Sequence, residues 1–317
     1  MLGIQMPEKN ELNKNAMGGT ELMAHRIERD CNKSLLNQVQ IIHSRVRELD
    51  PNKKKILVCH DLAGDPEVQK LKDPQYVAQF DKIVFVSHWQ REQYYMHLGL
   101  PYDKSIVLQN AIEPIPMHEK PHPRDGVTLI YHSTPHRGLD ILYAAFQQLA
   151  KEHPKLKLKV FSSFELYGWK QRDNNHKELF DRLRDHPQIE YNKSVSNERI
   201  REELKTAHIF AYPSVWQETS CLCLMEALSA GCYSVHSSLA ALPETSMGVT
   251  QMYDFTDNLQ QHVDRFYVEL KKAILAHERS WSDVKDSMAT TKTIADFKYD
   301  WQQRSYQWND LLKKVCG

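Results

Sequence analysis

The sequence predicts an α/β protein built from two doubly wound domains with parallel sheets. Short apolar runs alternate with longer segments of helical apolar spacing, which is the pattern of βαβ units. A proline-rich stretch interrupts this alternation once, and the alternation then starts again. The 317 residues also suit two domains, at roughly 100–200 residues each. Two such sheets facing one another leave a cleft at the carboxyl ends of their strands, where ligands bind.

The first domain is expected to cover residues 1–114. One helix opens at Gly18-Gly19, and another begins after Ser87, which suits an N-cap, and ends at Gly99. Strands are predicted at residues 39–43, 55–59, 82–86 and 105–108. Residues 115–126 form the predicted linker, because the prolines between positions 114 and 123 favour a stiff extended chain that cannot enter the centre of a sheet.

The second domain is expected to cover residues 127–293. Its predicted strands lie at 127–131, 157–161, 189–191, 209–212 and 232–235, and its predicted helices at 139–151, 177–184, 197–206 and 221–230. A last helix is predicted at 294–315, with Trp301, Trp308 and the Leu311-Leu312 pair on or near one stripe. Residues 294–317 are therefore expected to form a separate closing element.

Composition and charge exclude several classes of protein. Lys and Arg number 41, as do Asp and Glu, so no overall positive charge attracts nucleic acid and no nucleic-acid partner is expected. No apolar run approaches the roughly 20 residues of a membrane span, so membrane association is expected to be peripheral at most. Residues 1–15 have no basic end followed by an apolar core, which argues against a secretory leader and for a cytoplasmic protein. The six cysteines include no CxxC pair, so buried reduced thiols are expected rather than a zinc site.

The most informative segment is residues 209–235, where a strand, a Pro-Ser turn, a helix and a second strand follow one another. Glu218 lies where the loop meets the helix, and Glu226 lies eight residues further on. The two are expected to lie along one ligand, Glu218 at its reactive end and Glu226 at a sugar diol. An anion between them would meet the free N–H groups at the helix start, those of Thr219, Ser220, Cys221 and Leu222. The alternative is an exposed glutamate favoured by the helix dipole, followed by a solvated one.

Other loops that follow predicted strands carry further candidates. The loop after residue 131 contains Ser133 and the Arg137-Gly138 pair, and an arginine beside a helix N-terminus neutralises a pyrophosphate well. His60 directly follows the strand at 55–59, at the expected edge of the cleft. The sequence contains no DxD and no His, Cys and carboxylate cluster with metal-ligand spacing, so neither a metal nor a cofactor is expected.

These segments resemble the retaining glycosyltransferases of the GT-B fold, in particular family 4-like enzymes with an E-x7-E motif. The resemblance rests on Glu218 and Glu226 in their strand–helix context, on YHSTPHRGLDIL at residues 131–142 and on NAMGGTELM at residues 15–23, and it extends over most of the chain. It implies that the donor diphosphate meets Arg137, Gly138 and the loop of Gly18 and Gly19.

The resemblance also assigns the rest of the expected site. His60 would lie by the donor sugar and the acceptor. The base-binding loop would follow the strand at 189–191, which makes Asn192 and Lys193 candidates, and the final helix would cross back to the first domain. Three positions depart from the family pattern: Tyr131 stands where a second basic residue is usual, Cys221 where glycine is usual, and Ala111 where glycine usually follows asparagine.

The function implied by the resemblance is the retaining transfer of a hexose, by default glucose from UDP-glucose, to the hydroxyl of an unidentified glycan, lipid, protein or small-molecule acceptor. Without a metal, Arg137 and main-chain N–H groups would stabilise the charge on the leaving diphosphate. Retention would come from front-face attack, in which the leaving phosphate takes the acceptor proton, rather than from a covalent intermediate. Other classes stay open: a nucleotide-sugar epimerase, a non-catalytic sugar-nucleotide-binding module and a hydrolase.

Overall fold

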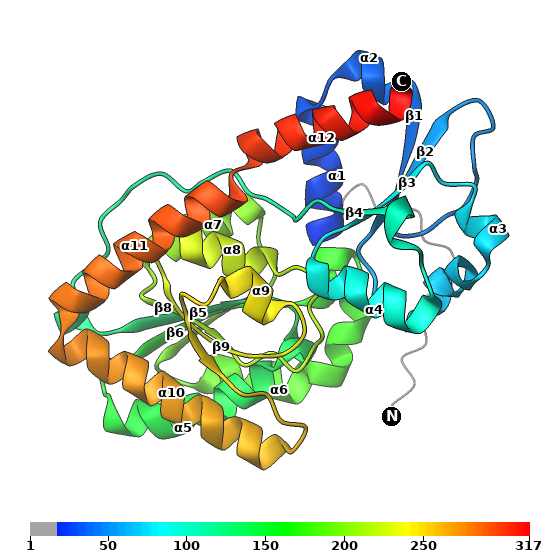
Figure 1. Ribbon diagram of the computed structural model, residues 1–317. Coiled ribbons are helices and arrows are strands. Elements are labelled where there is room, and N and C mark those ends of the chain that lie inside the picture. Colours follow the sequence, from blue (N-terminus) through cyan, green and yellow to red (C-terminus); the bar gives the residue numbers. More distant parts are fainter. Residues whose placement is uncertain (1–17) are drawn as a thin grey trace.

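Two parallel β-sheets, one in each half of the chain, form the framework of the protein (Figure 1). The computed structural model describes residues 18–317. The predicted absence of a secretory leader at residues 1–15 and the first residues of the glycine loop, 15–17, lie outside the described residues.

The N-terminal domain contains a four-stranded sheet in the order β1-β2-β3-β4. The strands are β1 (Val39–His43), β2 (Lys54–Cys59), β3 (Lys82–Phe85) and β4 (Ser105–Val107), each within one residue of its predicted limits. The helices are α1 (Gly19–Asp30), α2 (Lys33–Leu36), α3 (Pro74–Val77) and α4 (His88–Leu98), with 3-10 turns η1 (Pro66–Lys72) and η2 (Tyr102–Lys104). The cap predicted for α4 is confirmed, since the Ser87 hydroxyl accepts a hydrogen bond from the Gln90 N–H at 3.0 Å.

The N-terminal sheet is wound in one direction within residues 18–317, because its four strands follow chain order. The sequence predicted a doubly wound sheet in this domain as well. Alternation of strands and helices reports which segments are buried but not the order in which the strands pair, so this detail was not encoded in the pattern.

The C-terminal domain contains a six-stranded parallel sheet in the order β10-β9-β8-β5-β6-β7. Its strands are β5 (Thr128–His132), β6 (Lys157–Phe161), β7 (Ile189–Asn192), β8 (Ile209–Tyr212), β9 (Tyr233–Ser237) and β10 (Gln251–Tyr253). Its helices are α5 (Leu139–Glu152), α6 (Lys177–Asp185), α7 (Asn197–Thr206), α8 (Leu222–Ser229), α9 (Leu242–Ser246), α10 (Leu259–Arg279) and α11 (Trp281–Tyr299), with 3-10 turns η3 (Pro123–Asp125), η4 (Pro135–Arg137), η5 (Phe164–Tyr167) and η6 (Lys170–His176). The sequence predictions omitted β10, α9 and α10.

The direction of winding in this sheet reverses between β5 and β8, which are neighbours in space although residues 133–208 separate them in sequence. The loops that follow these two strands therefore meet at one point. Gly138 occupies the closest approach, with a φ of 100°, and a Cβ atom built there would lie 2.1 Å from the Pro213 carbonyl oxygen. A reversal of this kind is where doubly wound sheets bind ligands.

The C-terminal segment bends once before it reaches the N-terminal domain. The sequence predicted one helix at 294–315, but α11 ends at Tyr299 and α12 (Trp301–Cys316) begins after Asp300. At the bend, the Ile112 N–H donates to the Tyr299 carbonyl and the Trp301 N–H donates to the Ile112 carbonyl, both at 2.8 Å. These bonds to the chain leaving β4 hold Asp300 extended, so only α12 crosses and lies along α1 and α2 (Figure 1).

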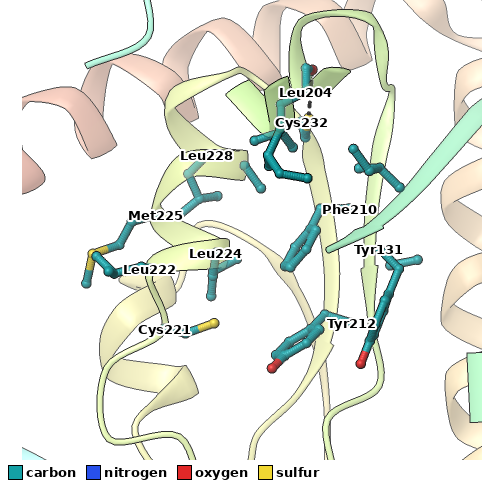
Figure 2. Packing of buried hydrophobic residues seen from close by; sticks show 14 of the residues in the cluster. Tyr131, Leu204, Phe210, Tyr212, Cys221, Leu222, Leu224, Met225, Leu228 and Cys232 are labelled. Atoms are coloured by element: carbon teal, nitrogen blue, oxygen red, sulfur yellow. Dashed lines mark hydrogen bonds between the residues drawn. The ribbon is translucent and has the colours of Figure 1, made fainter. Parts of the chain in front are cut away.

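The core of the C-terminal domain lies between the sheet and α8. Leu224, Leu228 and other apolar residues of α8 face the aromatic rings of Phe210 and Tyr212 on β8 (Figure 2). Tyr131 on β5 packs beside Tyr212, with ring centroids 5.8 Å apart, and its hydroxyl donates to the Thr134 carbonyl. The family position usually held by a basic residue is therefore part of the hydrophobic core here.

Candidate functional site

A cleft between the two domains lies at the carboxyl ends of β5 and β8. The N-terminal domain lines it with Gly18, Gly19, Thr20, Leu22, His60 and Asn110. The C-terminal domain lines it with His132, Ser133, Arg137, Phe161, Ser163, Leu166, Tyr167, Ser194, Val195, Asn197, Ile200, Glu218, Thr219, Ser220, Cys221, Leu222, Cys223 and Glu226. The structure thus gathers all the predicted site residues around one cleft except Gly138, Asn192 and Lys193.

Arg137 and Glu218 meet inside this cleft. An Nη1 hydrogen of Arg137 is donated to Oε1 of Glu218 at 2.5 Å, and the Tyr212 hydroxyl donates to the same oxygen at 2.5 Å. Glu218 is only 5% exposed. Burial opposes the charged form of Arg137, but Glu218 outweighs it and holds the pKa of the guanidinium well above its ordinary value. The pair is therefore charged, and the two charges cancel each other.

Arg137 keeps a donor in reserve. Its Nε atom is buried and has no hydrogen-bond partner within residues 18–317. A buried donor without a partner is costly, so a ligand with acceptor oxygens would gain from filling this position. The adjacent residues Thr219, Ser220, Cys221 and Leu222 also line the cleft, at the start of α8, as the sequence predicted.

Glu226 lies further along α8 and points into the same cleft. Its carboxylate accepts hydrogen bonds from Asn197 Nδ2 at 3.0 and 3.2 Å and lies 3.6 Å from the Arg201 guanidinium. Burial raises the pKa of this carboxyl group, although His132 and Asn197 counteract the effect. A buried carboxylate with free accepting capacity suits a pair of sugar hydroxyl groups.

His60 is the contribution of the loop after β2. Its ring stacks on His43, with His43 Nδ1 3.4 Å from His60 Nε2. Burial, together with the neighbouring His43, lowers the pKa of His60 to about 3, so the imidazole is neutral near pH 7. The Thr219 hydroxyl donates to the His60 carbonyl at 3.0 Å, which joins the two domains across the cleft.

The glycine loop approaches the C-terminal domain so closely that side chains are excluded. A Cβ atom at Gly18 would lie 2.5 Å from the ring of Tyr167, and one at Gly19 would lie 3.2 Å from Leu222. Glycine at these positions lets the main chain of the N-terminal domain reach the start of α8.

Three predicted site residues do not line the cleft. The Gly138 N–H, expected to face the diphosphate, instead donates to the Pro135 carbonyl, because η4 closes on itself at this point. The Asn192 amide donates to Glu190 at 3.0 Å, and Lys193 is exposed. In the expected base-binding loop, Ser194 and Val195 line the cleft instead, followed by Asn197.

The predictions missed His132, the last residue of β5. It is 6% exposed and lines the cleft, and its Nε2 atom has no hydrogen-bond partner in the described chain. Burial lowers the pKa of this imidazole, but Cys223 and Glu226 outweigh burial and raise it above its ordinary value. Its position at the carboxyl end of a strand was a signal that the sequence offered, since such positions border the cleft of a doubly wound sheet.

Two further properties were searched within residues 18–317. No group of three or more His, Cys, Asp and Glu side chains in this range converges as a metal-ligand set. None of the helices in the same range combines the length and the apolar character needed to cross a bilayer.

Comparison with known proteins places this cleft in a family context. Residues 127–267 match the family described as Glycosyl transferases group 1. The gpi3 subunit of phosphatidylinositol N-acetylglucosaminyltransferase from Schizosaccharomyces pombe is 22% identical over 80% of this chain and 57% of its own length. The related polypeptide of the Homo sapiens enzyme of the same name is 24% identical over 51% of this chain and 33% of its own length. The chain thus spans about half or less of the length of these curated relatives.

Solved structures share the fold at low sequence identity. A glycosyltransferase from Rickettsia africae has a TM-score of 0.67 and 14% identity, with 99% of this chain and 84% of that chain covered. The pneumococcal O-GlcNAc transferase GtfA, in complex with UDP and GlcNAc, has a TM-score of 0.64 and 12% identity, with 93% and 60% covered. Anabaena HepE in complex with UDP-glucose has a TM-score of 0.62 and 15% identity, with 83% and 72% covered. The predicted fold class, two α/β domains in the GT-B arrangement, is confirmed.

Proposed function

From its place among the GT-B glycosyltransferases of the group 1, family 4-like type, we propose that this chain transfers N-acetylglucosamine from UDP-GlcNAc to an acceptor hydroxyl with retention of configuration. The observation that carries the proposal is the convergence of Arg137, Glu218 and Glu226 with the Gly18-Gly19 loop of the other domain in one cleft. The names of the curated relatives favour N-acetylglucosamine over glucose, the sugar expected by default from the sequence.

Binding of the donor begins with an exchange of partners at Arg137. In the structure the guanidinium is neutralised by Glu218. A diphosphate at the start of α8 offers more negative charge and can fill the unpartnered Nε position, so Arg137 turns to the phosphates. Glu218 keeps the Tyr212 hydroxyl as a donor and becomes free to accept hydrogen bonds from the donor sugar.

The ribose and the sugar then lie at opposite ends of the cleft. Glu226, held by Asn197, accepts hydrogen bonds from the ribose diol, and the base lies toward Ser194 and Val195. His60 faces the sugar from the other domain. Because its imidazole is neutral, His60 acts there as a hydrogen-bonding group rather than as a cation.

The chemical step separates charge between the sugar carbon and the leaving diphosphate. Arg137 and the N–H groups at the start of α8 stabilise the developing charge, and preorganised donors of this kind are each worth about 3–4 kcal/mol. The acceptor hydroxyl attacks from the face that the diphosphate leaves, and the departing phosphate oxygen takes its proton. The anomeric configuration is thereby retained without a nucleophilic carboxylate.

The proposal is tested with a panel of nucleotide-sugars, measured by thermal shift and by release of UDP. We expect UDP-GlcNAc to raise the melting temperature and to release UDP only when an acceptor is supplied, with phosphatidylinositol as the first acceptor because the curated relatives carry it in their names. Turnover that persists in a chelator supports the metal-independent route. Conversion of the donor without an acceptor would point to an epimerase instead, UDP binding without turnover to a binding module, and the absence of any stabilising nucleotide-sugar would overturn the proposal.

A further inference from the structure

Two thiols stand in the cleft at the start of α8 and take no part in the proposed reaction. Cys221 is the N-cap residue and is buried, whereas Cys223 is half-buried in the first turn. Both line the cleft between Glu218 and Glu226. Figure 2 shows the Cys221 side chain at the start of the helix, on the side that faces Tyr212.

The surroundings of Cys223 favour its thiolate. The Cys221 thiol donates a hydrogen bond to its sulfur and lowers the pKa of Cys223 well below the ordinary value, and His132 adds a hydrogen bond and a positive charge. Position in the first turn of a helix acts in the same direction. In its thiol form the same sulfur donates to the His132 carbonyl at 3.0 Å.

His132 provides an independent sign that this corner of the cleft is built for chemistry. Its imidazole is more than nine-tenths buried, and its Nε2 atom has no partner among the described residues. The charged groups facing Cys223 are His132, Arg137 and Glu226, so the thiolate lies between two cations and one carboxylate.

We propose that Cys223 is a modification site for hydroperoxides, with Cys221 as the thiol that closes a disulfide and blocks the donor cleft. The Cys223 thiolate attacks a peroxide oxygen, the S–O bond forms, the O–O bond breaks, and the alcohol or water leaves after taking a proton from His132. The Cys221 sulfur then attacks the Cys223 sulfur, the S–S bond forms, the S–O bond breaks, and water leaves with the Cys221 proton. The two thiols lose two electrons and the hydroperoxide gains them.

Distance and access permit both steps. Residues two apart in a helical turn have Cα atoms about 5.4 Å apart, which lies within the range of a disulfide. The hydrogen bond between the two sulfurs already places them together. A diphosphate at the start of α8 would shield the same sulfurs and repel the thiolate, so donor binding and oxidation exclude one another.

The test treats the reduced chain with equimolar hydrogen peroxide and maps the cysteines by mass spectrometry. We expect a Cys221–Cys223 disulfide in the parent chain, a dimedone-trapped sulfenic acid at Cys223 in Cys221→Ser, and no rapid oxidation at position 221 in Cys223→Ser. Cys316 is the internal reference, since it is half-buried on α12 away from the cleft. Oxidation of Cys316 as fast as Cys223, or a Cys223 that stays reduced, would overturn the proposal.

Affinity measurements connect the modification to the cleft. Oxidation is expected to lower UDP affinity about tenfold in the parent chain, with recovery after dithiothreitol, and to leave the affinity of Cys223→Ser unchanged. Saturating UDP is expected to slow oxidation of Cys223 but not of Cys316, and equal rates with and without bound UDP would contradict the proposal. The role of the cleft as a UDP site rests on the proposed function, whose failure would appear separately as no UDP binding to the reduced chain.

Discussion

Replacement of Arg137 by methionine separates two roles of one side chain. Arg137 is the partner of a buried carboxylate, with side-chain exposures of 19% for Arg137 and 6% for Glu218. Removing one member of such a pair costs about 3–5 kcal/mol of folding free energy. Because Tyr212 still donates to Glu218, we expect the lower end, about 3 kcal/mol. The same variant is expected to lower kcat about 10²–10³-fold, through loss of a group that stabilises the leaving diphosphate.

A double variant distinguishes the two effects. Arg137→Met combined with Glu218→Gln removes the uncompensated charge, so most of the lost stability should return while turnover stays low. Lys159→Met is the matched control, because Lys159 also pairs with a buried carboxylate, Glu203, which keeps Arg199 as a second partner outside the cleft. It should be destabilised with unchanged UDP affinity. Guanidinium unfolding and calorimetry with UDP measure both quantities, and a double variant that regains turnover together with stability would refute the assigned role of Arg137.

Three further predictions concern the nucleotide, the domain contact and pH. Glu226→Gln should weaken UDP binding by about 1.5–3 kcal/mol in calorimetry, the value of a hydrogen bond to a charged group, and an unchanged Kd would remove the ribose assignment. Gly18→Ala should lower turnover by crowding Tyr167, whereas Gly64→Ala, where a Cβ meets nothing within 4 Å, should retain parental kinetics; equal loss in both would count against the close approach. Several buried histidines have a pKa lowered by burial to about 3 or 4, so the unfolded chain takes up protons below pH 6.5 before the folded chain does, and stability should fall by up to about 1.4 kcal/mol per group and pH unit between pH 6.5 and 4. Guanidinium midpoints across this range provide the check, and a midpoint that rises on acidification would contradict it; the groups are His43, His60, His136 and His236.

Local patterns predicted much of the secondary structure because they record burial and capping along the chain. The strand at residues 209–212 and the cap at Ser87 agree with the structure, since each depends on neighbours in sequence. The bend at Asp300 could not be found in this way. It depends on hydrogen bonds to Ile112, which lies far away in sequence, and the apolar stripe of the predicted helix continues across it.

The sequence by itself placed Glu218, Glu226 and Arg137 at the ends of strands and the start of a helix, where parallel sheets present functional groups. Only the tertiary structure decided that Arg137 and Glu218 bind each other, because the reversal of strand order between β5 and β8 brings their loops together. It also decided that Tyr131 enters the core while His132 faces the cleft, since successive residues of a strand point to opposite sides. Spacing along a chain reports which residues border a cleft, but partners in it are chosen by the order in which the strands pair.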